Sequence, residues 1–223
     1  MGPTQIDLTG PKLEWPHQLM PMIAISMRAH RYQDLERRMR HWASLITLLP
    51  ATQGTKLNYA KWDQMGRCPL RRLSHGQMGC YESHVRVWKL IVQERLPRAL
   101  VLEDDADIVY SEKTVQRLNE FLHELERIPD WDVAYLGNVP LHPPKRTLAP
   151  HINEPSYWEG LYCYMITYEG ARKLLPTMFP MRQAIDVHVG NQMRKGLIRG
   201  VMMNPALCYV VPVVSDTDVR RTM

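Results

Sequence analysis

The sequence predicts an α/β fold in which a mixed, mainly parallel β-sheet is flanked by helices. From Met22 to Leu136, short apolar runs of strand length alternate with longer segments whose apolar residues recur at helical spacing. That alternation is typical of β-α-β units, whose neighbouring strands are parallel. In addition, the run Ala99–Leu102 is apolar at every position, as expected of a strand that is buried on both faces.

The predicted elements follow one another along the chain. Residues 1–19 are rich in Pro, Gly and polar side chains and are interpreted as an irregular lead-in, whereas residues 20–223 are interpreted as one domain. This domain is expected to begin with a strand at Met20–Met27 and an amphipathic, Arg-rich helix at Arg28–Trp42. Further strands are predicted at 45–49, 99–102, 131–137 and 161–167, with a broken or edge strand in 201–214. Further helices are predicted at 85–96, 113–128 and 169–175, with a helix or turn at 184–194 and an extended proline-rich loop at 138–155.

Composition and charge describe an ordinary protein with an excess of arginine. Of the 223 residues, 45% are hydrophobic and 23% are charged, and 28 Lys and Arg against 23 Asp and Glu give a formal net charge of +5. The arginines cluster at Arg28–Arg40 and Arg67–Arg72, which favours anionic ligands such as phosphates. The basic residues show neither zinc-finger spacing nor an RNA-binding motif, so no nucleic-acid partner is expected.

Cysteine usage and the apolar pattern predict a cytoplasmic protein. The four cysteines form no Cys-x-x-Cys pair, which argues against a disulfide framework and favours a reducing compartment. Cys80 and Cys163 are expected to be thiols of the core. The sequence begins without the basic and apolar regions of a signal peptide, and no apolar run approaches the length of a membrane-spanning helix.

The strand predicted at Ala99–Leu102 runs directly into a cluster of carboxylates. Glu103, Asp104 and Asp105 are adjacent, and Asp107 follows two positions later. Ligands of open α/β sheets collect at the C-terminal ends of strands, and oxygen-only clusters suit Mg²⁺ or Mn²⁺, so this cluster is the leading candidate for a metal site. In an extended chain, Glu103, Asp105 and Asp107 share one side of the strand. The alternative is a solvated acidic turn that holds no cation.

Two arginines near the start of the predicted domain are candidates for binding phosphate. Arg28 and Arg31 lie where the first predicted strand meets the first helix. At that position, helix N–H groups and guanidinium groups both favour anions. A solvated helix start explains the same residues equally well.

Several short motifs follow one another in a fixed order between about residues 22 and 215. They are a strand and Arg-rich helix at 25–39, the turn Ala51–Gly54, the segment Gly79–His84 followed by Trp88, the acidic signature Leu100–Asp105, the strand Trp131–Gly137, the pair Tyr164–Ile166 and Gly170–Leu175, and Asp186. Together these motifs resemble glycosyltransferase family 25, the lipopolysaccharide biosynthesis and collagen galactosyltransferase-like family. The chain departs from the family pattern where Gln53 replaces an acidic residue, and it matches poorly at 138–155 and after His188.

The resemblance implies a GT-A type fold and a metal-dependent, inverting glycosyltransferase. Such an enzyme moves a hexose, with galactose as the first expectation, from a UDP-sugar donor to a hydroxyl of a glycan or glycoconjugate, and the implied cofactor is Mn²⁺ or Mg²⁺. Asp105 and Asp107 are expected to bind the metal, although the sequence does not choose between the possible carboxylate frames. Asp186 is expected to act as the general base. The donor-binding residues are expected to be Arg28, Arg31, Ser83, His84, Glu103 and Asp104.

Several of these assignments have simpler alternatives. Asp186 is also suited to capping a helix, and Ser83 and His84 are favoured as structural residues. A lone His188 is more often neither a metal nor a diphosphate ligand, whereas Trp158 is expected to be exposed and to stack on a sugar ring. For the whole chain, the alternatives are a non-catalytic sugar- or nucleotide-binding protein and, less favoured, a metal-dependent phosphoesterase.

Overall fold

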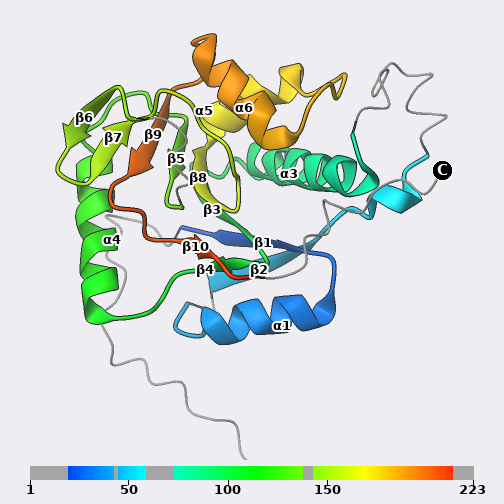
Figure 1. Cartoon of the computed structure of the whole chain (residues 1–223), viewed down its shortest axis with the longest axis horizontal. Helices are drawn as coiled ribbons and strands as arrows, with labels where there is room; N and C mark the ends of the chain where they lie inside the picture. The colour runs from blue at the N-terminus through cyan, green and yellow to red at the C-terminus, as the bar shows by residue number, and fades with distance from the viewer. Residues whose placement is uncertain (1–19, 43–44, 59–72, 138–142, 213–223) are drawn as a thin grey trace, which may run out of the picture.

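Eight strands form one mixed sheet in the part of the chain that the structure describes, a computed structural model covering residues 20–42, 45–58, 73–137 and 143–212 (Figure 1). The strand order is β2-β1-β3-β8-β5-β9-β7-β6. The strands are β1 (Met22–Ser26), β2 (Ile46–Pro50), β3 (Arg98–Glu103), β5 (Val133–Tyr135), β6 (Arg146–Ala149), β7 (Ile152–Glu154), β8 (Cys163–Thr167) and β9 (Gly200–Met203). Six of these described strands run in one direction, and β8 and β7 run against them. The predicted fold class is therefore confirmed.

Helices cover both faces of the sheet (Figure 1). The helices on one face are α3 (His75–Gln93), α5 (Tyr168–Leu174) and α6 (Ile185–Arg194), and those on the other are α1 (Ala29–Arg38) and α4 (Glu112–Leu125). The short 3₁₀ segments η2 (Gly54–Lys56) and η3 (Leu175–Thr177) contact α3 and α5, respectively. Side chains alternate along β3, so Val101 enters the core that contains α3, whereas Leu100 and Leu102 enter the core that contains α4. None of the described helices has both the length and the apolar character that crossing a bilayer requires.

Local sequence signals explain where the two longest described helices begin. Ser74 precedes α3 and forms a capping box with Gln77, in which each side chain accepts a hydrogen bond from the other residue's backbone N–H. Ser111 precedes α4, and its side chain accepts a hydrogen bond from the Thr114 N–H. α3 ends at Gln93, and Pro97 immediately precedes β3. Proline cannot continue a helix, so Pro97 separates the helix from the strand. Both predicted helices are present, but α3 begins at His75 and not at the predicted residue 85, because Ser74 and Gln77 cap it there.

Two proline-rich regions contain more strand than the sequence predicts. Within the segment 138–155, predicted to be a loop, the described part forms the β6–β7 hairpin, while residues 138–142 lie outside the described residues. The segment 201–214, predicted to hold a broken or edge strand, is broken into two short strands. The first, β9, is not an edge strand, because it lies inside the sheet between β5 and β7. The second is β10 (Tyr209–Val210), which pairs with β4 (Ala106–Asp107) in a separate two-stranded sheet. In both regions the prolines flank the strands and do not interrupt them.

Candidate active site

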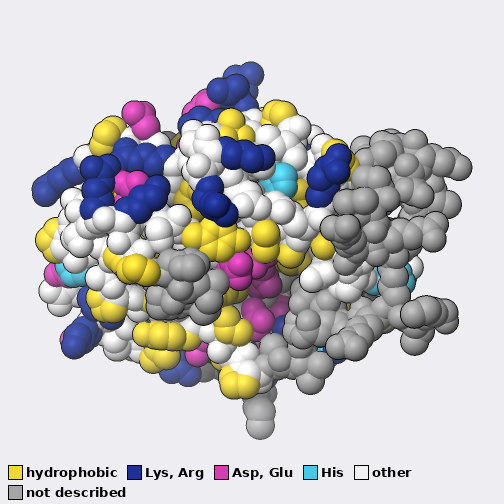
Figure 2. Space-filling model, turned by 45° about the horizontal axis from the view of Figure 1, so that its top comes forward, with side chains coloured by type: hydrophobic (Ala, Val, Ile, Leu, Met, Phe, Trp, Pro, Cys, Tyr) yellow, Lys and Arg dark blue, Asp and Glu magenta, His cyan; other side chains and the backbone are white. Residues whose placement is uncertain are grey.

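A cavity of about 270 Å³ opens where β1 and β3 end. Its walls come from the ends of these strands, the start of α1, the segment 51–55 and α3. The charged side chains that line it are Arg28, Arg31, Glu103, Asp104 and Asp105. Figure 2 shows acidic side chains gathered in a recess near the middle of one face of the molecule. The acidic cluster and the two arginines therefore meet at one edge of the sheet.

A second cavity of about 250 Å³ adjoins the first. Cys80, Glu103 and Asp105 line both cavities. The second cavity is also lined by Gly160, which precedes β8, and by Asp186 in the first turn of α6. The structure thus brings Asp186 to the same site as the acidic cluster, although the two lie far apart in the sequence.

The Asp104 carboxylate forms a hydrogen bond and an ion pair with other residues of the chain. Ser26 Oγ donates a hydrogen bond to one of its carboxylate oxygens at 2.6 Å, and an Arg31 guanidinium nitrogen lies 2.5 Å from the other. The side chains of this ion pair are only 11% and 10% exposed, so the contact is well shielded from solvent. Asp104 therefore holds Arg31 against the end of β1, while it also lines the first cavity.

Asp105 is the carboxylate best placed to accept a cation. Its Oδ1 atom is buried and has no hydrogen-bond partner among the described residues. Burial, followed by the negative charges of Glu103 and Asp104, raises the Asp105 pKa from 3.8 to about 6, against the opposing effect of Arg31. A divalent cation would satisfy the buried oxygen and offset the crowded negative charge. The residues present therefore fit Mn²⁺ or Mg²⁺ at Asp105.

Asp107 lies apart from the other carboxylates. The chain turns at Asp104 and Asp105 and then forms β4, so it does not stay extended as the sequence suggested. The Asp107 carboxylate lies 3.9 Å from Nε of Arg38, which also donates hydrogen bonds to the backbone carbonyls of Asp104 and Ala106 at 2.8 and 3.2 Å. Asp107 lines neither cavity. The condition of an extended chain is therefore not met: Glu103 and Asp105 line the same cavities, but Asp107 does not join them.

The wall at residues 51–54 rests directly on α3. A Cβ atom on Gly79 would overlap the Thr52 carbonyl, and one on Gly54 would overlap the His75 carbonyl, so both positions require glycine for close backbone approach. Ser83 Oγ accepts a hydrogen bond from the Thr52 N–H at 2.8 Å and donates one to the Gly79 carbonyl at 2.7 Å. Ser83 is buried. The Ser83 hydroxyl therefore joins the segment 51–54 to α3 at the wall of the first cavity.

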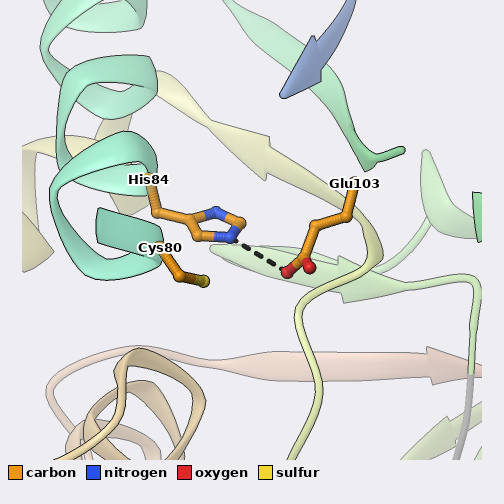
Figure 3. Close-up of side chains that lie close together, drawn as sticks. All are labelled: Cys80, His84 and Glu103. Atoms are coloured by element: carbon orange, nitrogen blue, oxygen red, sulfur yellow. Dashed lines mark hydrogen bonds and ion pairs between the residues drawn. The ribbon is translucent and has the colours of Figure 1, made fainter. Parts of the chain in front are cut away.

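His84 links the aromatic core to the acidic edge of the cavity (Figure 3). Its Nε2 lies 3.2 Å from Glu103 Oε1, and its Nδ1 lies 2.8 Å from the Tyr164 hydroxyl. Trp88 Nε1 donates a hydrogen bond to the same hydroxyl at 3.0 Å. The buried imidazole is thus fixed on both sides, and Glu103 is oriented by it.

Cys80 is a site residue that sequence reasoning assigned to the core. Cys163 is buried as expected, but Cys80 is only half-buried and lines both cavities. Burial, and then the charges of Glu103, Asp186 and Asp105, raises the pKa of the Cys80 thiol well above its ordinary value. The spacing of Cys80 and His84, four residues apart on one helix, is the signal that places them on the same face.

Asp186 is held by two backbone donors. Its Oδ2 accepts a hydrogen bond from the Gly160 N–H at 3.1 Å, and its Oδ1 accepts one from the Val187 N–H at 2.8 Å. The carboxylate also lies in the first turn of α6, where the helix dipole favours negative charge. Ala184, not Asp186, is the N-cap of α6, so Asp186 is not the capping residue that the alternative required. Its two contacts fix the carboxylate at the wall of the second cavity.

Two further candidates belong to the core. Trp158 is only 2% exposed and stacks on Tyr135 with ring centroids 3.8 Å apart, so the expectation that it is exposed to a sugar ring is wrong. His188 Nε2 lies 3.0 Å from Thr177 Oγ1 and 3.2 Å from Gln192 Nε2. Burial lowers the His188 pKa from 6.5 to about 4. His188 lines neither cavity, in agreement with the simpler alternative.

Comparison with known proteins identifies the family. The sequence model of glycosyltransferase family 25, described as an LPS biosynthesis protein, matches residues 28–139, which is half of the chain. The chain belongs to glycosyltransferase family 25. The family 25 match runs from α1 through β5 and includes the acidic cluster, whereas Asp186 lies beyond it.

Relatives in family 25 include proteins named as active and as inactive. Procollagen galactosyltransferase 1-B of Xenopus laevis is 33% identical over 172 residues, which cover 69% of this chain and 27% of the relative. The probable inactive glycosyltransferase 25 family member 3 of Bos taurus is 31% identical over 122 residues, which cover 52% of this chain and 20% of the relative. The matches thus span about a quarter or less of the length of these relatives. Activity therefore has to be argued from the site.

Two solved structures superpose on this chain with TM-scores below 0.5. A glycosyltransferase involved in the glycosylation of the major capsid of PBCV-1 superposes with a TM-score of 0.49 and 7% identity, covering 88% of this chain and 96% of that one. A197 from STIV superposes with a TM-score of 0.45 and 10% identity, covering 88% and 86%. Both likenesses are too loose to carry an argument about the site.

Proposed function

We propose that this family 25 chain is a metal-dependent, inverting glycosyltransferase. It moves a hexose from a UDP-sugar to a hydroxyl of a glycan or glycoconjugate, with galactose as the first choice because the Xenopus laevis relative is named a galactosyltransferase. The observation that carries the proposal is the pair of adjoining cavities, in which arginines, a buried carboxylate oxygen without a partner and a second carboxylate meet. The proposed location is the cytoplasm, as the cysteine usage predicts.

The first cavity suits a nucleoside diphosphate. Arg28 is exposed at the start of α1, and Arg31 is held at the cavity by Asp104. The side chain of Arg28, the N-cap residue of α1, forms no capping hydrogen bond, and the first N–H groups of α1 together with the guanidinium groups favour phosphate oxygens. Glu103, oriented by His84, is suited to accept hydrogen bonds from ribose hydroxyls.

Asp105 would hold the divalent cation. Mn²⁺ or Mg²⁺ bound there supplies positive charge that stabilises the diphosphate as it leaves. Arg31 contributes a second fixed positive charge at the same cavity, and its pairing with Asp104 keeps it in place without reorganisation. Asp107 does not line the cavity and instead helps to orient Arg38, whose Nε lies 3.9 Å from the Asp107 carboxylate.

Asp186 would act on the acceptor side. In an inverting transfer, the acceptor oxygen forms a bond to the anomeric carbon while the bond to the diphosphate breaks, and one base takes the hydroxyl proton. The Asp186 carboxylate lines the second cavity, which shares Glu103 and Asp105 with the first. Its two backbone hydrogen bonds hold it in position to receive that proton.

A screen of nucleotide sugars tests the proposal. We expect Mn²⁺-dependent hydrolysis of a UDP-hexose, which stops on addition of a chelator and returns when Mn²⁺ is restored. UDP binding without any hydrolysis or transfer would favour the non-catalytic alternative. Hydrolysis of simple phosphodiesters without preference for nucleotide sugars would favour a phosphoesterase instead.

A further inference from the structure

Cys80, His84 and Glu103 direct three different metal-binding atoms towards one point beside the cavities (Figure 3). The thiol sulfur, an imidazole nitrogen and a carboxylate oxygen all lie within 4.8 Å of one another. We infer that these three residues form a Zn²⁺ site that is chemically distinct from the cation position proposed at Asp105. The inference requires no nucleotide sugar and does not depend on transferase activity.

The backbone already arranges the three ligands. Cys80 and His84 are four residues apart on α3, so their side chains leave the same face of the helix one turn apart, a spacing that zinc-binding helices use. Glu103 is the last residue of β3 and reaches the same point from the sheet. His84 Nε2 and Glu103 Oε1 are 3.2 Å apart. Zn–N and Zn–O bonds of about 2.1 Å in a tetrahedron separate two ligand atoms by about 3.4 Å, so this pair is already spaced for zinc.

The surroundings of His84 support a ligand role. A histidine that binds metal through one nitrogen usually donates its other N–H to a fixed partner. Nδ1 of His84 lies 2.8 Å from the Tyr164 oxygen, and Trp88 Nε1 holds that oxygen with a hydrogen bond of 3.0 Å. When Nε2 binds the cation, Nδ1 carries the proton and donates it to the Tyr164 oxygen. The ring is thus oriented before the cation arrives.

Charge and ligand type select Zn²⁺ over the harder cations. When the cation binds, the Cys80 thiol releases its proton to solvent, because the metal binds the thiolate form. The resulting thiolate, a neutral imidazole and a carboxylate together carry two negative charges, which balance one divalent cation. Thiolate and imidazole ligands suit Zn²⁺, whereas Mg²⁺ and Mn²⁺ prefer oxygen ligands such as Asp105. Because Cys80 and Glu103 line both cavities, the fourth position of a tetrahedral ion is accessible from them. Three protein ligands and one open position are the pattern of zinc sites that take up an exchangeable ligand.

Co²⁺ provides the test, because it replaces Zn²⁺ and is coloured when bound by thiolate. The full chain, freed of metal with a chelator, should show a thiolate-to-Co²⁺ charge-transfer band in the near ultraviolet and intense visible bands of tetrahedral Co²⁺. Both should saturate at one ion per chain and disappear when Zn²⁺ is added. Cys80→Ser should lose the charge-transfer band, and His84→Gln should weaken Co²⁺ binding by more than about 100-fold. Circular dichroism verifies that each variant is folded.

Matched controls separate this site from its neighbours. Cys208→Ser removes a buried thiol that contacts Cys163, and Asp105→Asn removes the carboxylate proposed for Mn²⁺, so neither should change the charge-transfer band. A band that survives Cys80→Ser and disappears in Cys208→Ser would place the cation at the Cys163–Cys208 pair and overturn the inference. The absence of any band in the unaltered chain would also overturn it, leaving His84 as a link between Tyr164 and Glu103.

Discussion

Replacing Asp105 with Asn should stabilise the metal-free protein at neutral pH. The folded chain raises the Asp105 pKa from 3.8 to about 6, so the folded state holds a proton that the unfolded state releases between these values. Ionising the carboxylate in the folded chain costs about 3 kcal/mol for a shift of about two units, and partial exposure reduces this to about 1 to 2 kcal/mol. The penalty is absent below pH 3.8 and complete above pH 6. For a chain of this size, the gain corresponds to about 3 to 6 °C in Tm.

Thermal unfolding at several pH values, with and without Mn²⁺, measures this effect. The Tm difference between Asp105→Asn and the unaltered chain should grow as pH rises from 4 to 7.5, because only the unaltered chain acquires the buried charge. Mn²⁺ should raise the Tm of the unaltered chain and leave Asp105→Asn nearly unchanged. Asp107→Asn is the control, and it should keep its response to Mn²⁺. A Tm difference that does not vary with pH, or an equal Mn²⁺ response in both Asp105 forms, would refute the reasoning.

Three further predictions address separate parts of the site and the core. Arg28→Ala should weaken UDP binding about tenfold in calorimetry with little change in Tm. Arg37→Ala, in α1 and with a side chain that is 75% exposed, should leave UDP affinity unchanged. Equal losses of UDP affinity in the two variants would contradict the phosphate-binding role of Arg28. Asp186→Asn should bind Mn²⁺ and UDP normally but turn over about a hundredfold more slowly, and unchanged turnover would restrict Asp186 to the helix start. Because the folded-state pKa of His188 is about 4, below its ordinary 6.5, protons favour the unfolded chain as pH falls through this range. In the unaltered chain, lowering the pH from 7.5 to 5 should therefore cost about 1 to 2 kcal/mol of unfolding free energy through His188, after allowance for solvent screening. His188→Gln should lose this part of the pH dependence, and an unchanged pH dependence would contradict the reasoning.

The parts of the site that could be predicted are those encoded by neighbouring residues. The apolar run Ala99–Leu102 followed by Glu103 specifies a buried strand that ends in charge, and the structure shows this strand ending at the cavity. Arg28 lies two residues after the end of β1, so its place at this edge of the sheet also follows from local order. Parallel neighbours then bring both segments together, because β1 and β3 pair side by side with the same direction.

The parts that could not be predicted depend on pairing between distant segments. Asp107 turns away from Asp105 because β4 pairs with β10, about a hundred residues later, and no local pattern signals that pairing. Trp158 follows a proline-rich segment that reads as exposed, yet its ring stacks on Tyr135 from β5 and is covered by the fold. Asp107 and Trp158 are therefore placed by pairing and packing with distant segments, which their neighbouring residues do not encode.

The two sides of the proposed site are built from separate elements, so nucleotide binding and turnover should vary independently. The proposed donor side is built from residues between β1 and Asp105, whose contacts with one another, such as Ser26 and Arg31 to Asp104, do not involve α6. Asp186 is instead positioned by α6 and by the Gly160 N–H, and it meets the donor side only across the shared cavity edge. Changes around Asp186 can therefore alter the acceptor side without disturbing the ion pair that holds Arg31. This separation gives a physical basis for nucleotide binding and turnover to respond to different substitutions.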